Sequence, residues 1–360
     1  MPPPDLTEMT REQLTKFLAD AGQPRFRGDQ VFRWIWKKLA TGFGEMTDLP
    51  APLRQRLAEI ARIGGVRADR VDVSRDGTRK FLVRLADGLA VEAVLIPEDS
   101  RMTLCISSQV GCALACAFCA TGTMGLTRNL TAGEIAGQVA LAVRTLRDEP
   151  HEGHPERERP VTNIVYMGMG EPLHNYDEVL KSLRILTDAQ GMEFPARRIT
   201  VSTVGLVPQM HALGEAMPVT LAVSLHAPND LIRGRIMPVN KKYDLAAVLE
   251  ACRAFPLKSR ARITFEYVML ADVNDRLVDA DELATAIAGL RCKVNLIPWN
   301  EHEGAAFRRP ADEDVAAFAR HLEERGVTCM VRTTRGRDIA AACGQLALTA
   351  RGTGKETVPE

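Results

Sequence analysis

Residues 103–119 read TLCISSQVGCALACAFC, an apolar run followed by three cysteines in the spacing C-x3-C-x2-C. The run has the length and composition of a β-strand, and the cysteines follow it as a loop. Further along the chain, strand-like and helix-like segments alternate, which is typical of parallel βα units. Because such folds carry their chemistry at the carboxyl ends of the strands, the cysteine loop is predicted to lie at that edge.

The alternation after Arg101 predicts six βα units, and therefore an α/β fold built on a partial, open TIM-like barrel. The predicted strands are 103–108, 162–167, 198–203, 219–226, 261–270 and 292–298. The predicted helices are 131–147, 176–189, 205–215, 244–255, 279–289 and 311–325. A last short strand, 327–334, precedes a loop near the C-terminal end.

The first hundred residues predict two further units. Residues 10–62 contain three amphipathic helical patterns, and residues 69–97 alternate apolar and polar residues around two Asp-Gly turns. These patterns indicate a small N-terminal helical domain and a short, three-stranded β meander. We divide the chain into a helical accessory domain (1–65), a β-meander linker (66–98), a partial barrel with a C-terminal active-site loop (99–345) and a disordered charged tail (346–360). The charged, proline-rich segment 147–160 is expected to be a solvated insertion.

Composition is typical of a soluble globular protein. Hydrophobic residues make up 46% and charged residues 26%, and no stretch approaches the ~20 consecutive apolar residues of a membrane span. The polar N-terminus lacks a signal core, so we expect a cytoplasmic protein without a membrane partner. Basic and acidic residues balance at 46 each, so net charge neither indicates nor excludes nucleic acid. Four of the eight cysteines lie between Cys105 and Cys119, which favours metal or redox chemistry over a disulfide scaffold.

Cys112, Cys116 and Cys119 have the spacing expected of ligands to one [4Fe-4S] cluster. Three thiolates leave one iron without a protein ligand, and the amino and carboxylate groups of S-adenosylmethionine (SAM) suit that iron. Such a cluster reduces the sulfonium and releases a 5'-deoxyadenosyl radical. Two alternatives remain open at this point: a structural zinc site completed by a histidine or a distant cysteine, or buried cysteines that serve as small hydrophobic residues.

Seven motifs give the chain a close resemblance to a family of bacterial dual-specificity RNA methyltransferases in the radical SAM superfamily. The motifs are CISSQVGCALACAFCATG, YMGMGEPLHNYDEV, ITVSTVG, LAVSLHAPND, RGRIMPVNKKYDL, NLIPWN and RGRDIAAACGQL. The resemblance implies methylation of carbon 2 of adenine in 23S rRNA and in tRNAs, with two SAM molecules per turnover. We further expect an electron donor such as flavodoxin or ferredoxin, and a monomer.

Several residues at the carboxyl ends of predicted strands are candidate SAM ligands. By resemblance, Gly170 and Glu171 contact the cofactor, since a glycine-rich turn allows close approach and a carboxylate accepts from its amino group. A plain βα turn is the alternative. The other candidates, which could hold the ribose, adenine and methionine parts, are Ser202, Ser224, Leu225, His226 and Asn300. Each alone would more often be a strand-end cap, but their shared edge and the resemblance favour a binding role.

The resemblance also implies roles for two cysteines and a glutamate. Cys343 would be methylated and then lose a hydrogen atom, Cys105 would release the product through a transient disulfide with Cys343, and Glu92 would accept a proton. The alternative is an inert thiol, which we expect for Cys252, Cys292 and Cys329 because they lie in apolar patterns. For Glu92 the alternative is the polar face of an alternating strand.

Basic residues crowd one segment of the helical domain. Arg25, Arg27, Arg33, Lys37 and Lys38 alternate with Phe26, Phe32, Trp34 and Trp36. They predict phosphate pairing and base stacking, although an amphipathic helix with an aromatic core is the alternative. A second set of cations could line a channel to the active site: Arg233, Arg235, Lys241, Lys242, Arg332, Arg335 and Arg337. Two rival functions remain: methylation of adenine carbon 8, and non-catalytic RNA binding with a structural metal.

Overall fold

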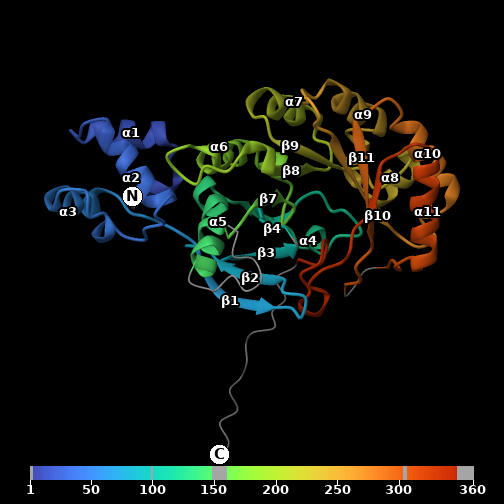
Figure 1. Ribbon diagram of the computed structural model, residues 1–360, viewed down its shortest axis with the longest axis horizontal. Helices are drawn as coiled ribbons and strands as arrows, with labels where there is room; N and C mark the ends of the chain where they lie inside the picture. Colours follow the sequence, from blue (N-terminus) through green and yellow to red (C-terminus); the bar gives the residue numbers. More distant parts are fainter. Residues whose placement is uncertain (1–2, 99, 148–159, 303–305, 347–360) are drawn as a thin grey trace, which may run out of the picture.

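The computed structural model describes residues 3–98, 100–147, 160–302 and 306–346 of the 360-residue chain. Within these ranges the strands form one ten-stranded sheet and one two-stranded hairpin. The large sheet follows the order β1-β2-β3-β4-β7-β8-β9-β10-β11-β12, so that β1 and β12 stand at its two ends. Figure 1 shows helices arranged around the outside of this curved sheet. Apart from boundary residues, the predicted 147–160 insertion and 346–360 tail lie outside the described residues.

Parallel pairing joins the strands of the predicted βα units. These strands are β4 (Arg101–Cys105), β7 (Asn163–Tyr166), β8 (Ile199–Thr203), β9 (Thr220–Ser224), β10 (Ile263–Met269), β11 (Cys292–Pro298) and β12 (Cys329–Val331). The helices are α5 (Ala132–Arg147), α6 (Tyr176–Thr187), α7 (Val207–Ala216), α8 (Asp230–Ile236), α9 (Leu245–Ala254), α10 (Leu277–Ala286) and α11 (Asp312–Glu324). The predicted α/β fold is confirmed, and α8 is an element that the sequence did not predict.

The predicted meander continues the same sheet. Its strands are β1 (Arg67–Val73), β2 (Arg79–Arg84) and β3 (Ala90–Glu98). They pair antiparallel with one another, and β3 pairs antiparallel with β4, where Val94 lies opposite Cys105. Because side chains alternate along a strand, Glu92, Val94 and Ile96 face the same side of the sheet. The predicted division of the chain into helical, meander and barrel units remains a prediction. The sheet continues from β3 to β4 across the predicted boundary at residue 98, so the strands do not mark a boundary there.

Three helices form the N-terminal unit. They are α1 (Arg11–Asp20), α2 (Phe26–Trp36) and α3 (Ala51–Ile60). A capping box starts α1, because Thr10 and Gln13 each accept a hydrogen bond from the other's backbone N–H. Gly28 lets α2 approach α1 closely, since a Cβ there would lie 2.6 Å from Thr15 Cα. A short turn, Leu6–Glu8, then connects this unit to the start of α5, where Glu8 accepts a 2.5 Å bond from Thr131.

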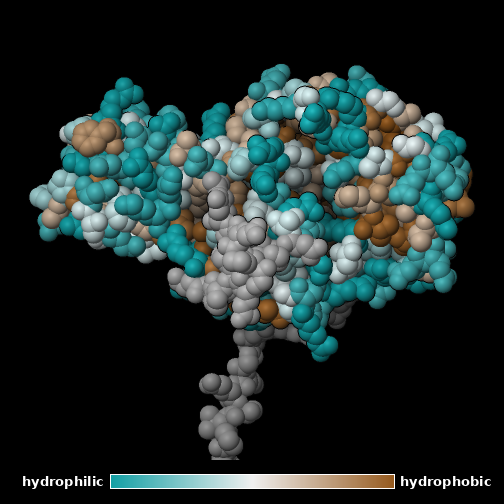
Figure 2. Space-filling view, in the orientation of Figure 1, coloured by the Kyte–Doolittle hydropathy of each residue, from teal (hydrophilic) through white to brown (hydrophobic). Residues whose placement is uncertain are grey.

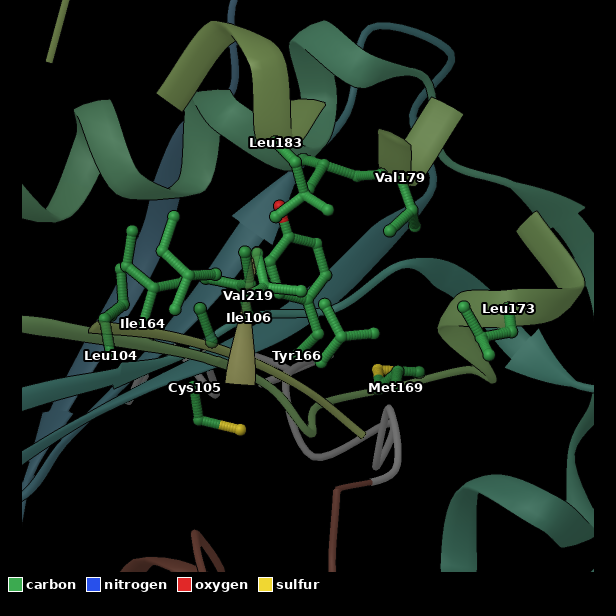
Figure 3. Close-up of a cluster of buried hydrophobic side chains, with 14 of the residues drawn as sticks. Leu104, Cys105, Ile106, Ile164, Tyr166, Met169, Leu173, Val179, Leu183 and Val219 are labelled. Atoms are coloured by element: carbon green, nitrogen blue, oxygen red, sulfur yellow. The ribbon is translucent and has the colours of Figure 1, made fainter. Parts of the chain in front are cut away.

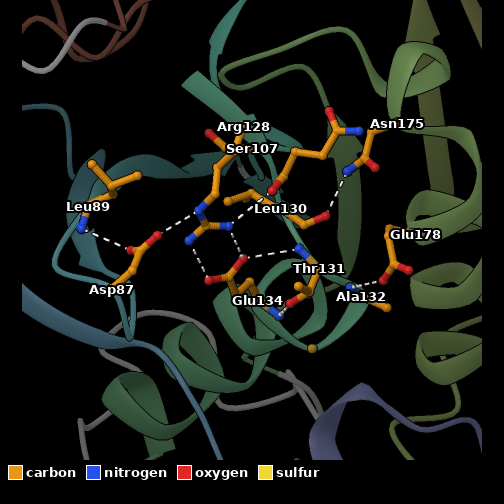
Figure 4. Close-up of polar contacts among 12 residues, drawn as sticks. Asp87, Leu89, Ser107, Arg128, Leu130, Thr131, Ala132, Glu134, Asn175 and Glu178 are labelled. Atoms are coloured by element: carbon orange, nitrogen blue, oxygen red, sulfur yellow. Dashed lines mark hydrogen bonds and ion pairs between the residues drawn. The ribbon is translucent and has the colours of Figure 1, made fainter. Parts of the chain in front are cut away.

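A small hairpin that the sequence did not predict holds the cysteine loop. It pairs β5 (Gln109–Cys112) with β6 (Gly125–Asn129), and α4 (Ala120–Thr123) lies between them. Gly111 has φ +77°, and a Cβ there would collide with the Gly125 carbonyl. Arg128 fixes the hairpin through a paired contact with Glu134 at the start of α5 and a 2.7 Å contact with Asp87 in the meander (Figure 4). The cysteine loop is therefore anchored to two other parts of the fold.

One apolar core extends from the helical unit through the barrel. It includes Phe32, Trp36, Phe81, Leu104 and Phe265, all nearly inaccessible to solvent. Figure 2 shows hydrophilic residues over most of the face in view, with smaller apolar areas among them. None of the helices in the part of the chain that the structure describes is both long enough and apolar enough to cross a membrane.

The close contact at Gly28 predicts a stability effect. Gly28→Val should lower the free energy of unfolding by about 3 kcal/mol, because the added atoms would force α1 and α2 apart. Urea denaturation measures the difference. Gly44→Val is the matched control, since nothing lies within 4 Å of a Cβ at Gly44. Equal stability of the two variants would show that the helices do not pack as described.

Candidate active site

Cys112, Cys116 and Cys119 line one side of a cavity at the carboxyl ends of the parallel strands. Their loop is fixed by backbone bonds from Ala117 N to Ile236 O (2.9 Å) and from Ala120 N to Gly344 O (2.8 Å). Burial raises the pKa of Cys112 to about 11 and that of Cys116 further, and the nearby thiols add to both shifts. Thiolates could persist in this site only with a positive partner such as iron.

This donor set fits an iron–sulfur cluster. Among the described residues, no three His, Cys, Asp or Glu side chains converge on a point as ligands of a single metal ion do. A cluster requires a different arrangement, because each thiolate binds its own iron at a separate corner. Three thiols from one short loop, all on one cavity wall, match that requirement.

The turn after β7 also lines this cavity. Gly170 has φ +97°, and a Cβ there would lie 2.5 Å from Gln109 Cβ, so glycine is required. Glu171 is buried, and its carboxylate accepts 3.0 Å bonds from the backbone N–H groups of Leu173 and Val204. Burial outweighs these bonds and raises the pKa of Glu171 to about 7. The carboxylate thus joins the turns after β7 and β8 at the cavity.

Four more of the predicted SAM ligands line this cavity: Ser202, Ser224, His226 and Asn300. His226 Nδ1 accepts a 2.9 Å bond from Val268 N, so the proton of the neutral ring resides on Nε2. Burial lowers the pKa of His226 to about 3, which keeps the ring neutral. Leu225 differs, because its side chain lies in the core and only its backbone N–H, bonded to Glu266 O, is near the strand end.

Asn300 carries a buried polar atom that suits a ligand. Its amide nitrogen donates to Cys343 O at 3.2 Å, while its buried Oδ1 has no hydrogen-bond partner among the described residues. A buried acceptor without a donor is costly, so a ligand that brings an N–H or O–H group would stabilise this site. The amino, ribose and adenine groups of SAM all offer such donors.

A second, more polar cavity lies on the inner face of the sheet. Cys105 lines it, and in Figure 3 the Cys105 side chain extends to the opposite side of the strands from Leu104 and Ile106. Six residues line both cavities and so form their junction: Met167, Glu266, Ile297, Asn300, Arg332 and Cys343. Cys343 therefore lies where the cluster cavity meets the cavity that contains Cys105.

Glu92 lies beside these cavities on the same strand face as Val94 and Ile96, which line the second one. Its carboxylate pairs with Lys80 at 3.2 Å, and both side chains are buried. Lys80 is a site residue that the sequence did not predict. A detectable signal existed, because Lys80 and Glu92 are diagonal neighbours across β2 and β3.

Two more residues were missed or misjudged at the site. Arg332 was predicted only as a channel cation, but it lies at the junction, where Cys343, Glu266 and Cys105 raise its pKa. Arg233 was predicted to line a channel, which is wrong. It is fully buried in α8 and donates to Val204 O, Asn240 Oδ1 and Tyr243 O, so it fastens the loops behind Cys116.

The basic and aromatic segment of the helical unit divides in the structure. Phe32 and Trp36 are buried, as the amphipathic-helix alternative holds. Phe26 is 53% exposed, and Lys38 lies 3.5 Å from the ring centre of the partly buried Trp34. Of the cysteines expected to be inert, Cys252 is buried, whereas Cys292 and Cys329 are half-buried.

Comparisons with known proteins agree with this site. Residues 4–63 match the model of the ribosomal RNA large subunit methyltransferase N-terminal domain, and residues 106–284 match the radical SAM superfamily. A dual-specificity RNA methyltransferase RlmN from Geobacter sulfurreducens is 50% identical over 98% of this chain and 96% of its own length. The chain belongs to the RlmN family. A second RlmN relative, from Anaeromyxobacter dehalogenans, is 51% identical over 96% of the chain and 92% of its own length.

A solved structure supports the same assignment for this RlmN-family chain. A radical SAM methyltransferase from Sphaerobacter thermophilus superposes with a TM-score of 0.89 at 46% identity, covering 96% of this chain and 99% of that one. The RlmN-family chain is accordingly a radical SAM enzyme of the RNA methyltransferase class, and SAM and a [4Fe-4S] cluster are the cofactors that its family implies.

The raised pKa of Glu171 predicts a pH-dependent stability. An unfolded glutamate ionises near 4.5 and Glu171 in the fold near 7, so the folded protein holds this proton more tightly. Its contribution to the free energy of unfolding should fall by roughly 3 kcal/mol as the pH rises through that window. Urea denaturation of wild type and Glu171→Gln across the window isolates this group, because glutamine does not titrate. A constant difference between the two proteins would refute the burial effect.

Proposed function

We propose that the chain methylates carbon 2 of adenine in 23S rRNA and in tRNAs, through a methylated Cys343. The observation that supports this most strongly is the position of Cys343 at the junction of the two cavities, with the cluster cysteines on one side and Cys105 on the other. A residue at such a junction can receive a group from one cavity and deliver it into the other. The family supplies the reaction class, and the junction suggests the route.

The first cavity would hold the cofactors. Cys112, Cys116 and Cys119 would bind the cluster, and Gly170, Glu171, Ser202, Ser224, His226 and Asn300 would bind SAM, with Leu225 contributing backbone only. When bound, the cluster and SAM supply a 5'-deoxyadenosyl radical that can remove a hydrogen atom from a carbon. Glu171 and the free Oδ1 of Asn300 offer acceptors for the amino and hydroxyl groups of SAM. Two SAM molecules serve each turnover, one as methyl donor and one as radical source.

A methyl carrier on the protein answers a chemical difficulty. Carbon 2 of adenine is electron-poor and does not attack a sulfonium methyl, but a carbon radical can add to it. The Cys343 thiolate would take a methyl group, and the resulting S–CH3 would lose a hydrogen atom to become S–CH2•. This carbon joins carbon 2 and forms a covalent protein–RNA adduct. The adduct would then return one electron to the oxidised cluster and give the proton on carbon 2 to Glu92.

Cys105 would release the product. Its sulfur attacks the Cys343 sulfur, the S–CH2 bond breaks, and the electron pair left on carbon takes a proton to give the methyl group. The two cysteines end as a disulfide, so two electrons from cytoplasmic thiols restore them. Burial raises the pKa of Cys105 to about 12, so this residue rests as a thiol, although the nearby Arg332 opposes the shift in part.

The second cavity would receive the target nucleotide. Its wall carries Arg101, Lys293 and Arg335, which can pair with phosphate, while Glu266 and Asn295 offer polar atoms to a base. Only a nucleotide out of its stack could reach Cys343, so we expect recognition of a loop or a flipped base. Arg25, Arg27, Arg33, Lys37 and Lys38 of the helical unit would contact RNA outside the cavity. The enzyme would act as a cytoplasmic monomer with a flavodoxin- or ferredoxin-like electron donor.

Replacement of Cys343 tests this function. Cys343→Ala should abolish RNA methylation while keeping iron and sulfide content unchanged, because no cluster ligand is removed. Mass spectrometry of digested RNA, after incubation of unmodified 23S rRNA with SAM and reductant, measures the product and its position. Cys252→Ala, in the core of α9, serves as the control and should methylate normally. Methylation by Cys343→Ala, or methyl groups on carbon 8, would overturn the proposal.

A further inference from the structure

The turn between β1 and β2 is bonded to the loop that carries Cys343. Asp76 Oδ2 accepts a 2.9 Å bond from Gly336 N, and Ser74 Oγ donates to Asp338 Oδ1 at 2.6 Å. Burial alone would raise the pKa of Asp76, but the bonds from Gly336 and Thr78 outweigh it and lower the pKa to about 2. Asp76 is therefore an ionised acceptor at any working pH. We call residues 74–78 together with 336–340 the clasp.

The clasp is tightly packed as well as hydrogen-bonded. Gly336 has φ +64°, and a Cβ there would lie 2.8 Å from Ala341 Cβ and 2.9 Å from Thr78 Cγ2. Such a close approach leaves no space for a side chain at position 336, so this end of the loop can pack against the meander in only one position. None of the clasp residues is among those that line the cavity of the cluster cysteines. The contacts of the clasp therefore do not follow from cofactor binding, which explains the residues of the cofactor cavity.

Lys80 connects the clasp to Glu92. It lies just after the turn, on β2, and its Nζ is 3.2 Å from Glu92 Oε1 and 3.3 Å from Ala340 O. Both side chains are nearly inaccessible, at 6% for Lys80 and 3% for Glu92. Burial of a lysine is costly unless a carboxylate and further acceptors compensate the charge. One ammonium group therefore contacts both the proposed proton acceptor and the loop three residues before Cys343.

We propose that Lys80 is a positioning residue that holds the Glu92 carboxylate and fixes the Cys343 loop, so that both groups meet the same adduct. This inference rests on the proposed function. In the step concerned, the proton on carbon 2 of the adduct passes to the Glu92 carboxylate. The contact of 3.2 Å with Lys80 holds the Glu92 carboxylate in place before the transfer. The Ala340 contact sets the position of the adduct against that carboxylate.

The proposal predicts where turnover stops in Lys80→Met. Methylation of Cys343 and formation of 5'-deoxyadenosine should continue, because they take place in the cofactor cavity. Loss of the proton from carbon 2 should slow roughly 100-fold, the lower range of what a proton acceptor contributes. The covalent protein–RNA adduct should therefore accumulate, as it should in Glu92→Gln. Intact-protein mass spectrometry and denaturing gels with labelled RNA measure the methyl-cysteine and the adduct.

Two controls separate positioning from folding. Lys80→Arg should restore most of the turnover, because it returns a cation to the same place. Arg67→Met, on β1 of the same hairpin, removes an exposed cation that pairs only at the surface with Asp69 and should leave turnover unchanged. Thermal unfolding and iron content are measured for every variant. Normal turnover by Lys80→Met would overturn the proposal. A Lys80→Met protein that forms neither the methyl-cysteine nor the adduct would also overturn it.

A further variant tests the proposal if Lys80→Met does not fold. Asp338→Ala removes the exposed half of the clasp and should lower RNA methylation several-fold at unchanged iron content, whereas unchanged methylation would overturn the proposal. Glu92→Gln distinguishes this inference from the proposed function. If the adduct accumulates in Glu92→Gln but not in Lys80→Met, the positioning role of Lys80 is refuted and the proposed function is not. Normal turnover in Glu92→Gln would refute the step in which Glu92 accepts the proton, on which the proposed function and the role of Lys80 both depend.

Discussion

The loop that carries Cys343 is held against the loop that carries the cluster cysteines. Ala120 N donates to Gly344 O at 2.8 Å, Asn300 Nδ2 donates to Cys343 O at 3.2 Å, and Trp299 Nε1 donates to Phe118 O at 3.0 Å. Residues from the end of β11 thus hold both loops at once. Without these bonds the two cavities would not share Cys343, and neither cavity alone contains all the groups that the proposed chemistry needs.

Burial sets the charge of the groups around this junction. His226 is kept neutral, and the cluster thiols resist ionisation until iron compensates them. Lys80 and Glu92, in contrast, are both buried and compensate each other as an ion pair. The second cavity is more polar and carries several cations, as expected of a site for a phosphate-bearing ligand. The site therefore separates a region suited to radical chemistry from a region suited to RNA.

The sequence predicted the parts of this enzyme that have a strong local pattern. The six βα units follow hydrophobic periodicity, and the cysteine spacing is itself the cluster motif. Residues that matter through long-range pairing were missed. Lys80 looks like an ordinary strand residue until β2 and β3 are in register, and Arg233 looks like a surface cation until α8 turns it inward. The β5–β6 hairpin was missed because its strands are short and their pairing depends on Gly111.

If the thiolates of Cys112, Cys116 and Cys119 hold a [4Fe-4S] cluster whose open iron binds SAM, the reconstituted protein must contain that cluster and must cleave SAM. Protein reconstituted with iron and sulfide under anaerobic conditions, then reduced with SAM present, is assayed for metal content and for 5'-deoxyadenosine. We expect brown protein with about four irons and four sulfides per chain and steady release of 5'-deoxyadenosine. Colourless protein that contains a single zinc and leaves SAM intact would contradict it.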